Sequence, residues 1–308
     1  MDYRKANPVS LTRKTMFRLI DDFRGRVPSI SYSGGGDPLM NPATVDVIEH
    51  CGSWLAQVLI TNGTGWKTLW DVKRLASNCR VIRISMDAAT KKTYAKVRGS
   101  KLYDKALSFI EHAVQWRSPK TEISASFMLS PFNYKETVKA TKLFKSMGVN
   151  RVTLKLVHSD FHDVTTKRVG FSTPDFLKKK GDTIKELIRE AMCEQTKDFH
   201  VHFRHPGEFE QMSVTHQKDL YRRCYLTPLI NAGIAADGNL YICCDRRGEL
   251  IIGNIEKNGF WDLWGSPRHK QLIDSIKLVD CPGRCRPTEM NIIVERAFIN
   301  EEMMWGLL

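Results

Sequence analysis

The stretch Ser31-Tyr-Ser-Gly-Gly-Gly-Asp-Pro-Leu-Met-Asn-Pro42 is the most informative part of this chain for predicting its fold. Residues 30–33 have the character of the end of a buried strand, and Pro42 is typical of the first turn of a helix. The glycines between them let a ligand approach the backbone closely, beside the acidic Asp37. A tight turn without a ligand fits the same residues, so the stretch alone leaves both interpretations open.

Length and composition are those of a globular protein with room for one large and one small domain. The chain has 308 residues, of which 42% are hydrophobic and 26% are charged. No apolar run approaches the roughly 18 residues that a bilayer-spanning helix needs, and the first residues lack the apolar segment of a signal peptide. We therefore expect no membrane partner and a cytoplasmic location. In a reducing cytoplasm the eight cysteines are metal ligands, catalysts or core residues rather than disulfides.

The net charge of +13 favours acidic partners in general. The basic residues are scattered, however, and no basic run carries the interleaved aromatic residues that track single-stranded nucleic acid. Charge alone is thus the only support for a nucleic-acid partner, and we do not expect one.

Short apolar strands alternate with amphipathic helices through the first half of the chain. We predict strands that end near residues 33, 61, 87, 129 and 157, with helices between them. Such alternation predicts parallel βαβ units. Polar residues gather where these strands end: Asp37, Asn62, Ser85, Asp87, Ser130 and Asn133. In a parallel barrel this is the face at which ligands bind.

These strand ends resemble the motifs of the radical S-adenosylmethionine (radical SAM) superfamily. Residues 33–38 resemble its Gly-Gly-Glu-Pro motif, and residues 61–64 resemble the Thr-Asn-Gly turn that often follows. Residues 84–87 and 97–99 come next in the same order, so the resemblance spans about residues 10 to 160. It implies a partial (β/α)6 TIM-like barrel that binds S-adenosylmethionine at the mouth formed by the carboxyl ends of its strands.

The resemblance also implies roles for individual residues. Gly35, Gly36 and Asp37 would take the methionyl amine, and the turn residue Asn62 would belong to the same site. Ser85 and Asp87 would lie near the ribose, and Arg98 would hold the methionyl carboxylate. Asp37 replaces the usual glutamate of the family, which shortens the side chain by one methylene but keeps its charge.

Lys155 and two histidines lie on predicted strands. Side chains alternate along the strand that ends near residue 157, so Thr153 and Lys155 could point into the barrel, although the lysine could equally extend out of the rim. His200 and His202 fall on one face of a further strand; with no third ligand nearby in the sequence, they are read as a polar strand face.

The second half of the chain carries a cysteine pattern: Cys224, Cys243-Cys244, Cys281 and Cys285. A hairpin with an Asp237-Gly238 turn delivers the central pair. Four thiolates can hold zinc or an iron–sulfur cluster, and unligated core thiols remain a third possibility. The segment resembles the SPASM/twitch domain, which implies an auxiliary 4Fe–4S cluster held by Cys224, Cys243, Cys281 and Cys285. Tyr241-Ile-Cys243-Cys244 aligns with a Tyr-Pro-Cys-Cys pattern of that family, which favours Cys243 over Cys244.

The Cys-x3-Cys-x2-Cys motif that binds the catalytic 4Fe–4S cluster in the family is absent, because no cysteine precedes Cys51. We therefore expect residues 1–205 to be an N-terminally truncated radical SAM core that lacks its first strand, missing roughly 15 to 40 residues. Residues 206–308 would be the SPASM/twitch domain. The catalytic cluster is expected only in a full-length form.

Two classes of function follow from the resemblance. The first is an iron–sulfur oxidoreductase or maturase that generates a 5′-deoxyadenosyl radical and abstracts hydrogen from a peptide or small-molecule substrate, with a reductant such as flavodoxin or ferredoxin. This truncated chain is expected to be inactive by itself. The alternative is a non-catalytic iron–sulfur platform that binds a peptide or protein partner.

Overall fold

The computed structural model describes residues 9–34, 36–157, 173–204, 220–226, 231–243, 248–281 and 288–296. The chain divides into two compact units, and each is described by itself: the first comprises Met1–Ala6 and Thr12–Glu210, and the second comprises Asn7–Leu11 and Gln211–Leu308. The predicted boundaries of the radical SAM core, residues 1–205, and of the SPASM/twitch domain, residues 206–308, stay predictions.

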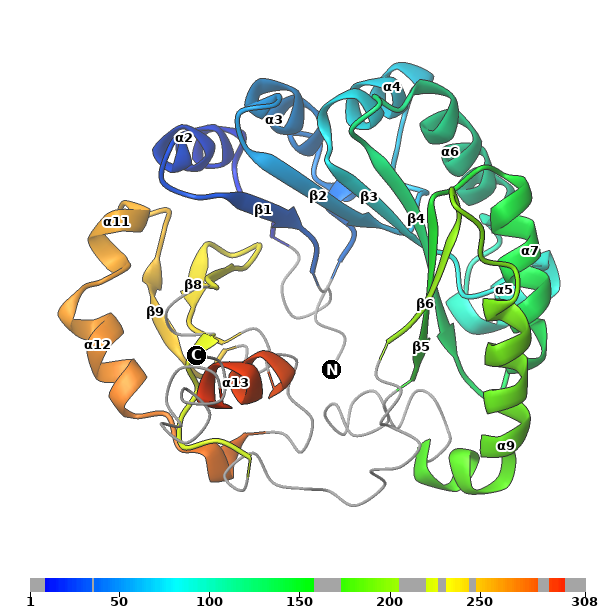
Figure 1. Ribbon diagram of the computed structural model, residues 1–308. Helices are drawn as coiled ribbons and strands as arrows, with labels where there is room; N and C mark the ends of the chain where they lie inside the picture. Colours follow the sequence, from blue (N-terminus) through cyan, green and yellow to red (C-terminus); the bar gives the residue numbers. More distant parts are fainter. Residues whose placement is uncertain are drawn as a thin grey trace, which may run out of the picture. The chain divides into compact units, whose positions relative to one another are not determined.

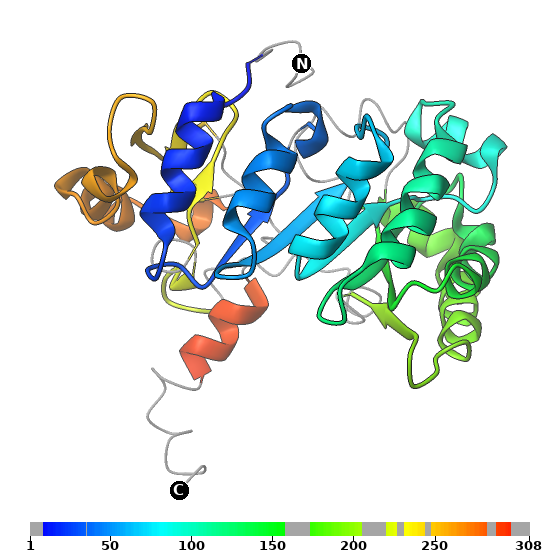
Figure 2. The same ribbon diagram turned by 90° about the horizontal axis from the view of Figure 1, so that it is seen from above.

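The first unit is built on a parallel sheet of six strands in the order β1-β2-β3-β4-β5-β6, as the alternating pattern predicted. The strands are β1 Ser29–Tyr32, β2 Ala56–Thr61, β3 Val81–Ser85, β4 Glu122–Leu129, β5 Arg151–Leu156 and β6 His200–Phe203. The main helices are α2 Arg13–Phe23, α3 Thr44–Cys51, α4 Leu69–Asn78, α5 Lys91–Arg98, α6 Tyr103–Trp116, α7 Thr137–Ser146 and α9 Thr173–Met192. Helices α2, α3, α4, α6, α7 and α9 cover the outer, convex side of the curved sheet, and they follow one another along it in chain order (Figures 1 and 2).

The two faces of the sheet differ in chemistry because side chains alternate along each strand. The face toward the helices is apolar: Leu59 pairs in register with Ile82, and Ile82 with Ile123, and all three are fully buried. The opposite, inner face carries Arg83, which pairs with Ser124. Burial of the apolar face against the helices stabilises the sheet and leaves the inner face for polar side chains.

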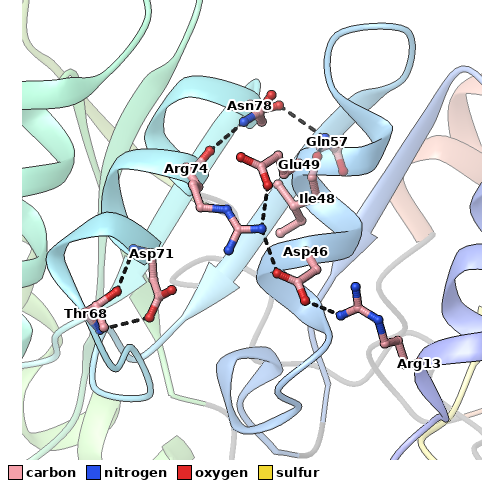
Figure 3. A network of polar contacts seen from close by, with 9 residues as sticks. All are labelled: Arg13, Asp46, Ile48, Glu49, Gln57, Thr68, Asp71, Arg74 and Asn78. Carbon is pink, nitrogen blue, oxygen red and sulfur yellow. Dashed lines mark hydrogen bonds and ion pairs between the residues drawn. The ribbon is translucent and has the colours of Figure 1, made fainter.

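Ion pairs connect the outer surfaces of α2, α3 and α4 (Figure 3). The carboxylate of Asp46 contacts the guanidinium groups of Arg13 and Arg74, the latter at 2.6 Å, and Arg74 also contacts Glu49. Hydrogen bonds from Arg13 and Arg74 lower the pKa of Asp46 below its ordinary value. We call these contacts the Asp46 network; they connect neighbouring helices on the outside of the sheet.

The second unit contains a three-stranded antiparallel sheet in the order β7-β8-β9. Its strands are β7 Gly233–Ile234, β8 Asn239–Tyr241 and β9 Ile251–Asn254, followed by α11 Phe260–Leu263, α12 Pro267–Asp274 and α13 Thr288–Val294. Strands β7 and β8 form the predicted hairpin around Asp237-Gly238, where Gly238 has a φ of +82° that glycine adopts without strain. Across the described parts of both units, no helix is long and apolar enough to cross a membrane.

Two helix starts differ from the sequence-based expectation. The helix predicted to begin at Pro42 begins at Thr44, because Asp37 instead caps a short 3-10 turn, Pro38–Met40. Helix α5 was not predicted; Thr90 caps it by accepting a hydrogen bond from the Thr93 amide. That helix matters for the site because it ends at Arg98.

Candidate functional site

Asp37 lies at the centre of the strand-end cluster of the first unit. Its buried carboxylate accepts hydrogen bonds from the Leu39 amide at 3.0 Å, the Thr61 hydroxyl at 2.9 Å and the Asn62 amide at 2.6 Å. The first contact caps the turn that follows the glycines, and the other two come from the end of β2. Asp37 therefore ties the glycine loop after β1 to the neighbouring strand end, a structural role that the sequence pattern did not predict.

The turn after β2 is held by Asn62 and two glycines. Asn62 Oδ1 accepts from the amide and the hydroxyl of Thr64, at 2.8 and 2.6 Å. Gly63 has a φ of +71° and packs against Ile84 and Phe109. A Cβ at Gly65 would lie 2.7 Å from Leu39 Cβ, so only glycine lets this loop approach the Asp37 turn. The predicted Asn62 thus shapes the mouth of the sheet next to Asp37.

Asp87, two residues after β3, has an unusual backbone and a buried charge. Its φ of +55° is the only positive φ of a non-glycine residue in the described part of the chain. Its carboxylate accepts from the Met128 amide at 2.7 Å and pairs with Arg98 at 2.9 Å. Such backbone conformations are uncommon outside turns and functional sites.

Arg98 and Asp87 form a largely buried ion pair. Burial raises the pKa of Asp87, while the charge of Arg98 and the Met128 amide act in the opposite direction. Lys155 also lowers that pKa by its charge, which places Asp87 and Lys155 within electrostatic range. Burial likewise raises the pKa of Tyr94, whose hydroxyl is hydrogen-bonded to Arg98. The structure thus joins the predicted ribose residue and the predicted carboxylate ligand in one contact.

A supporting layer around residues 87–93 was missed by sequence reasoning. Glu136 accepts hydrogen bonds from the Ala89 amide at 2.7 Å and from the hydroxyls of Thr90 and Thr93 at 2.8 and 2.6 Å. Asn133 donates to the Asp87 carbonyl at 2.8 Å. These partners lie more than 40 positions apart in the chain, and only the polarity of Asn133 at a strand end hinted at its place.

The remaining predicted residues of this site lie around the same mouth. Gly36 is exposed, and Ser85 is half-buried at the end of β3, in register with Ser126 on the inner face. The neighbouring Gly34 has a φ of +147° and open space around it. Gly35 lies outside the described residues. Asp37, Asn62, Ser85, Asp87 and Arg98 therefore all lie at or just beyond the carboxyl ends of β1–β3 and their loops.

The predicted cysteines of the second unit are only partly described. Cys224, Cys243 and Cys281 are half-buried and free of disulfides, whereas Cys244 and Cys285 lie outside the described residues. Cys224 and Cys281 pack against the same small core of buried side chains, which is formed by Tyr221, Tyr225 and Leu278. Among the described side chains, no three cysteines, histidines or acids come together as a metal site.

Helix α13 supports the Cys224 segment through Asn291. The buried Asn291 side chain donates from Nδ2 to Cys224 Sγ at 3.6 Å and accepts from the Tyr225 and Leu226 amides at 2.9 and 3.0 Å. One turn later, Glu295 accepts from the Tyr225 hydroxyl at 2.5 Å. A donor directed at a half-buried thiol suits a thiolate ligand, because hydrogen bonds to sulfur stabilise its negative charge.

Part of the second unit is similar to a known protein family. Residues 224–286 match the sequence model of the SPASM family, an iron–sulfur cluster-binding domain. This segment of the chain is therefore similar to the SPASM domain. This match covers the predicted cysteines from Cys224 to Cys285 and confirms the resemblance that their spacing indicated.

The fold of this chain resembles that of radical SAM enzymes. Streptococcus suis SuiB, solved with its precursor peptide SuiA, superposes with a TM-score of 0.65 at 14% identity over 89% of this chain and 65% of SuiB. The enzyme anSMEcpe with bound AdoMet superposes with a TM-score of 0.61 at 16% identity over 92% of this chain and 79% of that chain. The predicted partial-barrel fold is therefore confirmed.

A sequence relative comes from Saccharolobus solfataricus. It is a probable GTP 3′,8-cyclase, 24% identical over 228 residues that cover 70% of this chain and 68% of the relative. The related Saccharolobus islandicus protein is 22% identical over 224 residues. The sequence similarity therefore reaches well beyond the SPASM segment.

Proposed function

We propose that this SPASM protein binds S-adenosylmethionine at the mouth formed by the ends of β1–β3 and serves hydrogen-atom abstraction from a peptide or small molecule. The observation that carries the proposal is the convergence of Asp37, Asn62 and the Asp87–Arg98 pair at one end of a parallel sheet. Support also comes from the shared fold with anSMEcpe, which was solved with AdoMet bound.

Each residue at the mouth has a task that follows from its contacts. Asp37 already accepts three hydrogen bonds, so it shapes the glycine loop whose backbone groups, at Gly35 and Gly36, would meet the methionyl amine. Arg98 neutralises Asp87; because its side chain is 28% exposed, its guanidinium can also reach a carboxylate of the ligand. Ser85 and Asp87 would present oxygen atoms to the ribose hydroxyls.

In the second unit we propose an auxiliary 4Fe–4S cluster held by Cys224, Cys243, Cys281 and Cys285. The half-buried thiols of Cys224, Cys243 and Cys281, none of them in a disulfide, and the Asn291 donor suit this group. When bound, such a cluster supplies electron transfer or an anchoring iron near the substrate. Asn291 would keep the Cys224 thiolate in place and partly neutralise its charge, while the Tyr221–Tyr225–Leu278 core would exclude water from one side.

The similar proteins favour two different classes of substrate for this chain. SuiB and anSMEcpe were solved with peptides, which supports a peptide substrate here. The similarity to probable GTP 3′,8-cyclases favours a small molecule instead. A reductant of the flavodoxin or ferredoxin type would deliver electrons to either reaction.

Reconstitution tests the metal site. Purified without oxygen and supplied with iron and sulfide, the chain should hold about four iron atoms and absorb broadly in the visible range. Cys243→Ala should lose this cluster, while Cys244→Ala should largely keep it. A single tightly bound zinc ion and no visible absorbance would contradict the iron–sulfur assignment, and equal loss from both variants would show that the adjacent thiols share the role.

Titration calorimetry with S-adenosylmethionine tests the first unit. Asp87→Asn and Arg98→Gln should each weaken binding by about tenfold, because each breaks the ion pair that shapes the mouth. The 308-residue polypeptide should not cleave S-adenosylmethionine reductively with dithionite, since it contains no Cys-x3-Cys-x2-Cys. Fusing a strand-loop with that motif before Asp2 should restore a second cluster and 5′-deoxyadenosine formation. A fusion that binds both groups yet stays inactive would favour the non-catalytic platform.

A further inference from the structure

The inner face of the first unit's sheet, on the side away from the helices, carries a cluster of arginines. Arg83 on β3 pairs in register with Ser124 on β4, and Ser124 pairs with Arg151 on β5, so their side chains form a row. Arg204 directly follows β6 and continues the ladder by donating its amide to the Leu154 carbonyl at 2.9 Å. Alternation along β6 places Arg204 on the same face as His202 and His200. We call Arg83, Arg151 and Arg204 the arginine cluster.

Among the described residues, little negative charge balances this cluster. Glu122 contacts Arg151, with Nε and Oε1 3.0 Å apart, while Arg83 and Arg204 form no ion pair with any described residue. The other acid nearby, Asp87, is already paired with Arg98. Burial lowers the pKa of Arg83, and the charges of Arg204 and Arg151 lower it further, whereas the charge of Glu122 raises it. The guanidinium groups are thus close enough to repel one another.

Three buried polar atoms in this row have no hydrogen-bond partner among the described residues. Arg151 Nε still lies 3.0 Å from Glu122 Oε1 in an ion pair, whereas Arg83 Nε and the fully buried Ser124 Oγ have neither kind of contact with a described residue. An unsatisfied buried polar group typically costs about 1–3 kcal/mol, so such groups in functional proteins often mark the place of a ligand or a bound water. Here both atoms lie within the arginine row, next to the unbalanced charge.

We infer that the inner face binds the phosphate group of a phosphorylated substrate through Arg83, Arg151 and Arg204. A guanidinium fork matches the oxygens of either phosphate or carboxylate. Phosphate is favoured because it carries about −1.5 to −2 charges at neutral pH, against −1 for a carboxylate, and several cations must be offset. The inference that the bound molecule is a substrate rests on the proposed function; the anion site itself does not.

The position of the cluster suits a substrate below the proposed S-adenosylmethionine site. Arg83 precedes Ser85 by two residues on β3, a rise of about 7 Å at 3.3 Å per residue, and Asp87 lies two residues beyond the end of that strand. A phosphate held at the arginine row would therefore leave the rest of a small molecule to extend along the inner face toward the mouth.

Pyrophosphate is the probe that tests the inference, used with the full 308-residue chain in titration calorimetry at several salt concentrations. Pyrophosphate should bind with an affinity that falls as salt rises. Arg83→Gln and Arg204→Gln should each weaken binding at least tenfold. Arg80→Gln is the matched control: this exposed arginine lies directly before β3 and contacts the Lys120 carbonyl, so its loss should leave binding unchanged.

A thermal melt without ligand adds a second readout. Because Arg83 is repelled by its neighbours, Arg83→Gln should melt at or above the temperature of the unsubstituted chain while losing the stabilisation by pyrophosphate. Equal weakening by Arg80→Gln, no binding of pyrophosphate, or tighter binding of citrate than of pyrophosphate would each overturn the assignment. If the unsubstituted chain does not bind S-adenosylmethionine, but binds pyrophosphate in a manner that depends on Arg83, the proposed function is wrong and the phosphate site is supported.

Discussion

Replacing Asp37 tests whether this acid holds the glycine loop to β2. Asp37→Ala removes the acceptor of three hydrogen bonds, from the Leu39 amide, the Thr61 hydroxyl and the Asn62 amide. The Thr61 hydroxyl can rotate toward another acceptor, but the two backbone amides cannot. A buried donor left without a partner costs about 1–3 kcal/mol, and the Asn62 amide is partly reached by water. We therefore expect a loss of about 2–4 kcal/mol in the free energy of unfolding.

Asp71→Ala provides the matched control for this change. Asp71 also caps a helix start, by accepting from the Lys67 and Thr68 amides at 3.1 and 2.9 Å, but it does so at the exposed surface. Loss of such an exposed cap costs about 1 kcal/mol. Urea unfolding followed by far-ultraviolet circular dichroism measures both variants. If Asp37→Ala costs no more than Asp71→Ala, the buried contacts of Asp37 do not hold the loop.

Asp37→Asn separates the structural role from direct contact with a ligand. The amide keeps one acceptor oxygen but turns an NH2 group toward the donors, so the cost should be about 1–2 kcal/mol. If Asp37 acts through the loop, affinity for S-adenosylmethionine should fall together with stability. Lost affinity at unchanged stability would instead show that the carboxylate touches the ligand.

Three further predictions follow from other parts of the chain. Gly65→Ala should lower the free energy of unfolding by about 1–3 kcal/mol because the added Cβ would meet Leu39 in the Asp37 turn. In Gly181→Ala the added Cβ meets open space within a helix, so this variant should be neutral or stabilising. Urea unfolding distinguishes the two. Asn291→Asp keeps the acceptor for two backbone amides but loses the hydrogen-bond donor to the Cys224 thiol. The chain should therefore fold, and the reduction potential of its reconstituted cluster should become more negative in a redox titration. An unchanged potential would contradict the role of this contact. Asp46→Asn should cost less than about 1 kcal/mol at neutral pH because the carboxylate is 31% exposed. Since the folded pKa of Asp46 is lowered, the difference from the unsubstituted chain should begin to shrink as the pH falls below about 4 and should disappear once the pH has fallen through the folded pKa; it should also shrink in high salt.

Local patterns in the sequence were sufficient to predict the framework. Apolar runs punctuated by glycine and asparagine predicted the parallel strands, and the Asp237-Gly238 pair predicted the hairpin between β7 and β8. Asp37, Asn62 and Asp87 could be placed at one edge of the sheet because the carboxyl ends of parallel strands meet there. These features depend on backbone periodicity and turn chemistry, which act over a few residues.

The partnerships within the sites were decided by the tertiary structure. Asn291 meets Cys224 across 67 positions, and Glu136 reaches Thr90 across 46, so no local pattern could indicate either contact. The arginine cluster likewise depends on strand order and register, because a shift of one residue in any strand would turn its side chain to the helix-covered face. Sequence alone thus determined which chemical groups stand at the strand ends, whereas packing determined which of them neutralise one another and which are left to bind a ligand.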